Sequence, residues 1–292
     1  MSEENCYQML GYLAERGQVV KQIEICNTLW NGLLDDLQQN MLLRDLCINL
    51  RQLRSVMLLL SPLFPPEGEE WREKMKAMYM ALGNVREYDV AYQACGKYEA
   101  HTEELKVDNE DICSELPRLK ELLQKEYNER IIAWASIAEK NCITREMQLC
   151  LEILNKECGL SIEDEAKANA FLQARLQLWG IKLYNKLQEM STDHSVVQLH
   201  KLRVKVKRFR YAYEVYMGKD ADEALLQGLK ELQDVLGALH DSDRNLEIVD
   251  EVLAKAEIDE ALAKEVACFK AWRETKKQQR MKQLQPAVLQ LL

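Results

Sequence analysis

The stretch from Ser195 to Met217 constrains the fold most strongly, because its pattern fits a helix with one buried face. It contains neither glycine nor proline. Its large apolar side chains recur at alternating steps of three and four residues, at Leu199, Leu202, Val206, Phe209, Tyr213 and Tyr216. This spacing places them along one stripe of an α-helix. The stretch therefore predicts a helix that packs this stripe into a core.

The same stretch concentrates positive charge. Between His200 and Tyr211 it holds one histidine, three lysines and three arginines, in a chain whose formal net charge is −9. At about 100° per residue, the side chains that fall within an arc of about 80° are His200, Arg203, Lys207 and Arg210, with Tyr211 at the edge of this arc. Like charges at this spacing repel one another. A helix that gathers them is therefore typical of a face that binds an anion.

A solvated helix face is the alternative interpretation of these cations, since exposed helices often carry lysines at such spacings. A solvated face usually mixes signs, however, and no acidic residue lies between Gln198 and Glu214. Arginine also suits phosphate oxygens, because its planar fork donates two parallel hydrogen bonds. The pattern favours anion binding over a simple solvated face.

The rest of the chain is also typical of helices. Leucine, glutamate, lysine, glutamine, alanine and methionine are good helix formers and dominate the 292 residues, whereas proline occurs five times. No run of alternating apolar and polar residues lies between turn signals, as a strand would require. The sequence predicts an all-α protein.

A second motif follows the basic stretch, between Leu232 and Asp243. Together the two stretches resemble the CHAD family, the conserved histidine α-helical domain. That family has the pattern His-x-x-Arg, four residues, Arg-x-Arg-Tyr and, after a spacer, Leu-Gln-x-x-Leu-Gly-x-x-His/Asn-Asp. The matching positions are His200, Arg203, Arg208, Arg210 and Tyr211 in the first part, and Leu232, Gln233, Leu236, Gly237, His240 and Asp241 in the second.

The resemblance implies a fold and a ligand. CHAD proteins consist of two four-helix bundles related by an approximate twofold axis, and the family is associated with inorganic polyphosphate. The residues that we expect to bind this polyanion in the second half are His200, Arg203, Lys207, Arg208, Arg210 and Tyr211. Tyr211 could also simply pack, and His240 is placed equally well to join the site or to stay outside it.

The first part of the chain repeats this region in weaker form. When Gly83 is aligned with Gly237, with a two-residue difference in the spacer, the cations Arg44, Arg51 and Arg54 fall where the second half has His200, Lys207 and Arg210. Cys47 and Gln52 replace Arg203 and Arg208. A repeat that keeps apolar and charged positions in phase indicates two similar helical bundles. We expect Arg44, Arg51 and Arg54 to join the polyphosphate site. Because the first repeat has fewer cations, we expect the second half to provide most of the affinity.

Three sections are expected along the chain. Residues 1–100 form a first helical bundle with the degenerate repeat, the acidic residues 101–116 form a linker, and residues 117–292 form a second bundle that carries the basic motif.

Glycines and capping residues predict several helix boundaries. Gly83 is expected to end a helix over 69–82, and a helix over 222–239 is expected to be followed by another whose N-cap is Asp241 or Ser242. Gly237, which weakens the helix that contains it, is expected to allow a neighbouring helix to approach closely.

Several classes of protein are disfavoured by the composition. No apolar run is long enough to cross a membrane, and no signal sequence is visible, so we expect a soluble, cytoplasmic protein without a membrane partner. An isoelectric point near 5.2 disfavours a general nucleic-acid binder. The nine cysteines lack a Cys-x-x-Cys pair and are interpreted as buried thiols rather than as disulfides or a zinc site.

The sequence thus supports three hypotheses for function. The first is non-catalytic binding of inorganic polyphosphate, free or in granules, through basic helix faces, with no cofactor. The second is a helical interaction module that docks an acidic protein. The third, suggested by His240-Asp241, is a metal-dependent phosphohydrolase; we disfavour it because further metal ligands are not evident.

Overall fold

A computed structural model describes residues 3–65, 67–104, 112–143, 162–190 and 195–292. These residues form helices and connecting turns, without strands, so the predicted all-α class is confirmed. The α-helices are α1 (Glu3–Arg16), α2 (Val19–Asp35), α3 (Asn40–Leu60), α4 (Glu67–Glu104), α5 (Pro117–Ile137), α7 (Ile162–Glu189), α8 (Val196–Met217), α9 (Glu223–Leu253) and α10 (Glu260–Leu289). The stretch predicted to be helical from Ser195 to Met217 is α8.

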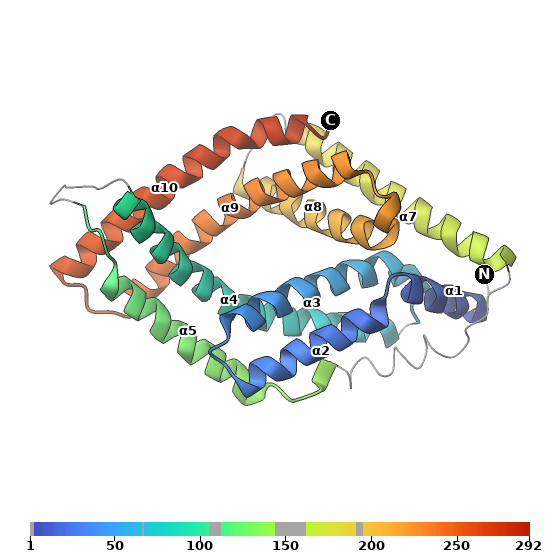
Figure 1. Cartoon of the computed structure of the whole chain (residues 1–292), viewed down its shortest axis with the longest axis horizontal. Helices are drawn as coiled ribbons and strands as arrows, with labels where there is room; N and C mark the ends of the chain where they lie inside the picture. The colour runs from blue at the N-terminus through green and yellow to red at the C-terminus, as the bar shows by residue number, and fades with distance from the viewer. Residues whose placement is uncertain (1–2, 66, 105–111, 144–161, 191–194) are drawn as a thin grey trace.

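The helices are arranged around a central pair (Figure 1). Helices α3 and α8 pack against each other in the middle of the molecule, with α2 on the outer side of α3 and α7 on the outer side of α8. The long helices α4 and α9 pack against α3 and α8 respectively and also contact each other. Two helix pairs, α3 with α4 and α8 with α9, therefore face each other across the centre.

The predicted apolar stripe of α8 is buried. Leu202 and Val206 are completely inaccessible to solvent, and Leu199, Phe209 and Tyr216 retain less than a tenth of their exposed surface. Burying a side chain of this size stabilises the fold by about 1.5–3 kcal/mol. The stripe therefore fixes the rotation of α8, and the cations beside it must face α3 and α9.

Two buried clusters make up the core. The larger contains side chains of α1 to α5 together with parts of α7, α8, α9 and α10. The smaller contains side chains of α7, α8, α9 and the end of α10. The larger cluster thus takes residues from both sides of the segment 101–116, in which α4 extends to Glu104. The approximate twofold relation expected between two bundles stays a prediction.

Two predicted helix breaks are wrong. Helix α4 continues through Gly83, and α9 continues through Asp241 and Ser242, so neither Asp241 nor Ser242 is an N-cap. Apolar residues keep helical spacing across both positions, and their burial outweighs a cost of about 1 kcal/mol for a glycine in a helix. The Ser242 hydroxyl donates to the Ala238 carbonyl at 2.9 Å, a bond that lets serine remain inside a helix.

Candidate anion-binding cleft

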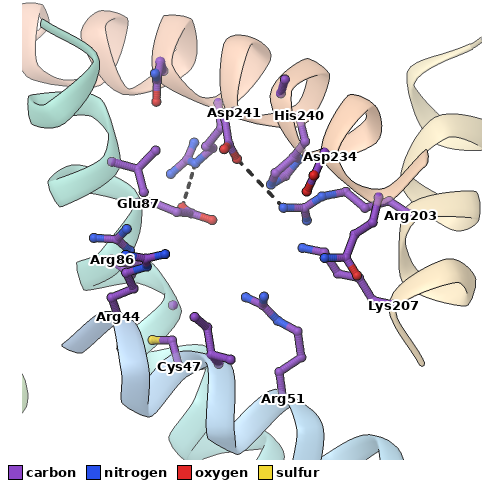
Figure 2. A pocket seen from close by; sticks show the side chains of 18 of the residues that line it. Arg44, Cys47, Arg51, Arg86, Glu87, Arg203, Lys207, Asp234, His240 and Asp241 are labelled. Atoms are coloured by element: carbon purple, nitrogen blue, oxygen red, sulfur yellow. Dashed lines mark hydrogen bonds and ion pairs between the residues drawn. The ribbon is translucent and has the colours of Figure 1, made fainter. Parts of the chain in front are cut away.

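A cleft of about 500 Å³ opens where α3 and α4 face α8 and α9. Figure 2 shows side chains from all four helices pointing into it. The cations that line it are Arg44, Arg51, Arg86, Arg203, Lys207 and Arg244. The carboxylates that line it are Glu87, Asp234 and Asp241. Arg44 and Arg51 from the first half of the chain therefore meet Arg203 and Lys207 from the second in one cavity with an excess of positive charge.

On the α8 side, Arg203 and Lys207 are the central cations. Both are largely buried, and Arg203 approaches the Asp241 carboxylate at 3.8 Å, beyond hydrogen-bonding distance. The Arg203 Nε atom is buried and has no hydrogen-bond partner among the described residues. An unsatisfied buried donor of a charged group costs about 1–3 kcal/mol or more. This donor is therefore available to an incoming acceptor.

Lys207 is destabilised as a cation. Burial, and secondarily the nearby charges of Arg203 and Arg51, lowers its pKa from 10.5 to about 6. The Asp241 carboxylate opposes this shift without overcoming it. A ligand that brings negative charge next to Lys207 would restore its protonation.

On the α3 side, the cations have local partners. The Arg51 Nε and Nη2 atoms donate to the Tyr79 hydroxyl at 3.1 and 3.0 Å. Arg86 forms an ion pair with Asp89. Because a phenol carries no charge, Arg51 keeps its full positive charge toward the cleft, whereas the charge of Arg86 is partly balanced.

Arg244, on α9, is fully compensated. Its guanidinium donates to Glu87, Glu247 and Glu251 at 2.7, 2.9 and 2.8 Å, and these carboxylates raise its pKa. Arg244 therefore ties α9 to α4 at the edge of the cleft and has little charge left for a ligand.

Two glycines open the cleft. Gly83 and Gly237 both line it, and a Cβ atom placed on either would meet nothing within 4 Å. The expectation that Gly237 allows a neighbouring helix to approach closely is therefore wrong. Instead, the absence of a side chain on α4 and α9 keeps space beside the cations.

Not all the predicted residues reach the cleft. Arg44, Arg51, Arg203, Lys207 and His240 line it. The burial of His240 lowers its pKa to about 3, and its ring lies 5.8 Å from that of His200. His200 itself is exposed and lines a neighbouring surface groove that also contains Arg208.

The remaining predicted residues make contacts within and between the helices around the cleft. Arg210 donates to Gln233 at 3.0 Å and to Glu214 at 3.1 Å, which joins α8 to α9. Tyr211 is buried, with 3 % of its surface exposed, so it packs. The Arg54 guanidinium lies over the Tyr79 ring, 4.6 Å from its centroid. None of these three lines the cleft.

Sequence reasoning missed several residues of the cleft, among them Arg86, Glu87, Tyr79 and Arg244. A signal for Arg86 and Glu87 was present, because the internal alignment places them on His240 and Asp241. Arg86 in fact lines the cleft opposite His240, on the other helix pair. No sequence motif indicated Tyr79 or Arg244, whose roles depend on contacts between distant helices.

The prediction of buried cysteine thiols is confirmed for only some of the described cysteines, since Cys6, Cys113, Cys142 and Cys268 are only partly buried. Cys26, Cys47 and Cys95 are buried free thiols, and burial raises the pKa of Cys47 to about 11. Cys150 and Cys158 lie outside the described residues. In the described part of the chain, no group of three or more metal-ligating side chains is placed to hold a metal ion. The same part contains no helix that is long and apolar enough to cross a membrane.

The structure defines an all-α protein with a cationic cleft between two helix pairs. The comparison with known families shows the family to which it belongs. Residues 22–250 match the CHAD domain, so the chain belongs to the CHAD domain family.

Solved structures with the same fold include the CHAD domain from the plant Ricinus communis, with a TM-score of 0.69 and 19 % identity over 96 % of this chain and 91 % of that one. PptA from Streptomyces chartreusis is similar with a TM-score of 0.66 and 14 % identity over 98 % of both chains. At these identities the likeness concerns the fold. No curated protein sequence matches the chain.

Proposed function

We propose that the chain binds inorganic polyphosphate, or a closely related linear polyanion, in the cleft between α3–α4 and α8–α9, without catalysing its hydrolysis. One observation carries the proposal. Arg203 and Lys207 are buried beside Arg51 with too little compensating charge, so the pKa of Lys207 falls to about 6. A fold that holds cations in this way is stabilised when an anion enters.

The chemistry of the cleft fits a phosphate chain better than a nucleic acid. Arginine forks and a lysine suit phosphate oxygens, and the buried Arg203 Nε atom has no hydrogen-bond partner in the described part of the chain. Reading bases would require free aromatic faces or base-edge contacts. The Tyr79 ring is instead covered by the guanidinium of Arg54.

The size of the cleft also favours a slender ligand. A cavity of about 500 Å³ accommodates several linked phosphates but not a folded acidic domain. An acidic protein segment that inserts side chains is the second hypothesis, and it predicts competition with polyphosphate. Free chains and polyphosphate granules in the cytoplasm present the same repeating anion, so either could occupy the site.

The test compares polyphosphate binding by the unmodified chain and by an Arg203→Gln/Lys207→Gln variant, with Lys230→Gln as the matched control. Lys230 is an exposed cation of α9 that does not line the cleft. We expect the double variant to lose most of its affinity and the control to keep it. Equal affinity in all three proteins would remove polyphosphate from this cleft. Release of orthophosphate by the purified protein would contradict the non-catalytic part of the proposal.

A further inference from the structure

A second cavity, of about 460 Å³, opens between α4, α9 and α10. It shares Val90, Ala238, Asp241 and Asn245 with the cleft, and its other lining residues are different. Helices α4, α9 and α10 contact one another in this part of the molecule, and in Figure 1 α10 runs alongside α9 there. Nothing in the proposed polyphosphate site explains this cavity.

Three residues that line it each carry a buried hydrogen-bond donor with no partner among the described residues. These donors are the Asn245 Nδ2, Trp272 Nε1 and Arg273 Nε atoms. Asn245 has 1 % of its surface exposed and Arg273 has 8 %. Each unsatisfied buried donor costs about 1–3 kcal/mol, so three around one cavity point to an acceptor that they bind together.

Arg273 is held in place by contacts that leave its Nε atom unpaired among the described residues. The Arg273 Nη2 atom donates to the Ser242 hydroxyl at 3.1 Å, and that hydroxyl donates in turn to the Ala238 carbonyl. The Arg273 guanidinium also lies 5.4 Å from the centroid of the Trp272 indole. These contacts fix the orientation of Arg273 and use one end of its guanidinium, whereas Nε remains unpaired.

The charges around the cavity select an anion. Besides Arg273, the cations that line it are Lys97, Lys276 and Arg280, and the carboxylates are Glu104 and Asp241. A ligand surrounded by N–H donors and cations must offer acceptors and negative charge. Because Asp241 lies in the wall shared with the cleft, a phosphate chain continuing from one cavity to the other would meet a carboxylate.

We propose that this second cavity binds a compact inorganic oxyanion, of the size of orthophosphate or pyrophosphate, held by Asn245, Trp272 and Arg273 and attracted by Lys97 and Lys276. The site adjoins the polyphosphate cleft along one shared wall but has its own donors and cations. The proposal for this cavity and the proposal for the cleft can be tested independently. Apart from Asn245, the donors of the second cavity do not line the cleft.

The experiment measures pyrophosphate binding by calorimetry in an Arg51→Gln/Lys207→Gln host. These substitutions weaken the cleft, and neither residue lines the second cavity. We expect the host to bind one pyrophosphate per chain. Trp272→Phe removes one donor and keeps an aromatic ring, while Lys276→Gln removes one charge. We expect each to weaken binding in the host by about tenfold, corresponding to about 1.4 kcal/mol.

Lys282→Gln is the matched control, because Lys282 is an exposed cation of α10 outside the cavity. It should bind pyrophosphate as the host does. Circular dichroism establishes that each variant remains helical, and Lys276→Gln serves if Trp272→Phe does not fold. The proposal is overturned if the host binds no pyrophosphate, or if Lys276→Gln and Lys282→Gln bind it equally well. Loss of polyphosphate binding by the host tests the cleft alone and leaves this result unaffected.

Discussion

The two walls of the cleft supply equal numbers of cations but hold them differently. The α3–α4 wall contributes Arg44, Arg51 and Arg86, and the α8–α9 wall contributes Arg203, Lys207 and Arg244. In the first wall, Arg51 rests on the neutral Tyr79 hydroxyl and Arg86 pairs with Asp89. In the second, Arg244 is neutralised by three glutamates, while Arg203 and Lys207 are buried without adequate compensation.

This difference shows that charge number alone does not identify the residues that bind. A cation already paired must give up its partner to meet a ligand, so it adds little. A desolvated cation without a close partner gains the most from an anion. The expected dominance of the second half therefore rests on Arg203 and Lys207 rather than on its larger number of basic residues.

The largest expected effect is the loss of affinity when the uncompensated pair is removed. We expect Arg203→Gln/Lys207→Gln to weaken polyphosphate binding by about 100-fold, because charge-assisted hydrogen bonds of buried cations contribute about 1.5–3 kcal/mol each. We expect Arg44→Gln/Arg51→Gln to weaken it by about tenfold, because Arg44 is exposed and Arg51 already donates to the Tyr79 hydroxyl. Fluorescence titration of both variants with polyphosphate of one chain length measures the difference. Equal losses would show that the two walls contribute equally.

The second expected effect is a pH dependence of polyphosphate affinity that is caused by the titration of Lys207. Its pKa in the free protein is about 6, set by burial and by the facing Arg203, Arg51 and Arg210 against Asp241. A bound polyanion raises this pKa, so binding takes up a proton above about pH 6. Affinity should rise as the pH falls toward 6, by at most about tenfold per unit, and level off below it.

The control for this pH dependence is Arg51→Gln, a substitution in the α3–α4 wall. Lys207→Gln should flatten the pH profile between about pH 6 and 9, whereas Arg51→Gln should lower affinity without flattening it, since an arginine does not titrate in this range. Proton uptake, measured by calorimetry in buffers of different ionisation enthalpy, provides an independent readout. A profile that persists in Lys207→Gln would assign the titration to another group.

Much of the fold followed from periodicity, because buried stripes such as Leu202 and Val206 reveal a helix and its inward face. The helix breaks at Gly83 and near Asp241 were wrong, because capping and glycine preferences of about 1 kcal/mol are smaller than the burial of the residues on either side. Local sequence signals cannot show whether the capping and glycine preferences or the burial of the flanking apolar residues contributes more free energy.

The residues that line the candidate cleft were predicted only in part, because helical spacing does not show contacts between distant helices. Helical spacing correctly grouped Arg203 and Lys207 on one face, and the internal repeat pointed to Arg44 and Arg51. The same spacing could not show that Arg210 would bond to Gln233, since that depends on how α9 is placed.

A third effect concerns stability without ligand. Lys207→Met should raise the free energy of unfolding at pH 7 by about 1–2 kcal/mol, because it removes a buried group that is charged in the unfolded chain. The lowered pKa makes this gain largest near and below pH 6 and smaller as the pH approaches 10.5, where the unfolded lysine also loses its proton. Urea denaturation at several pH values measures it. Arg51→Met should not stabilise, since it leaves the Tyr79 hydroxyl without its partner.

The smallest expected effect compares the two glycines. Gly83→Ala and Gly237→Ala should each stabilise the protein by about 0.5–1 kcal/mol, because alanine favours the helix and its methyl group meets open space. Each methyl protrudes into the cleft, so polyphosphate affinity should fall by no more than about threefold. Thermal unfolding and titration report the two effects separately. Destabilisation by either substitution would contradict the open space found beside these glycines.

The salt dependence of polyphosphate binding tests the central claim most directly, because it counts the phosphates that the cleft neutralises. For single-stranded nucleic acid the logarithm of the affinity falls with the logarithm of salt concentration by about 0.7 per neutralised phosphate, and polyphosphate should be similar. We predict a linear plot whose slope is shallower by about 1–1.5 in Arg203→Gln/Lys207→Gln and unchanged in Lys230→Gln. An affinity indifferent to salt, or one slope shared by all three proteins, would contradict binding of a phosphate chain by Arg203 and Lys207.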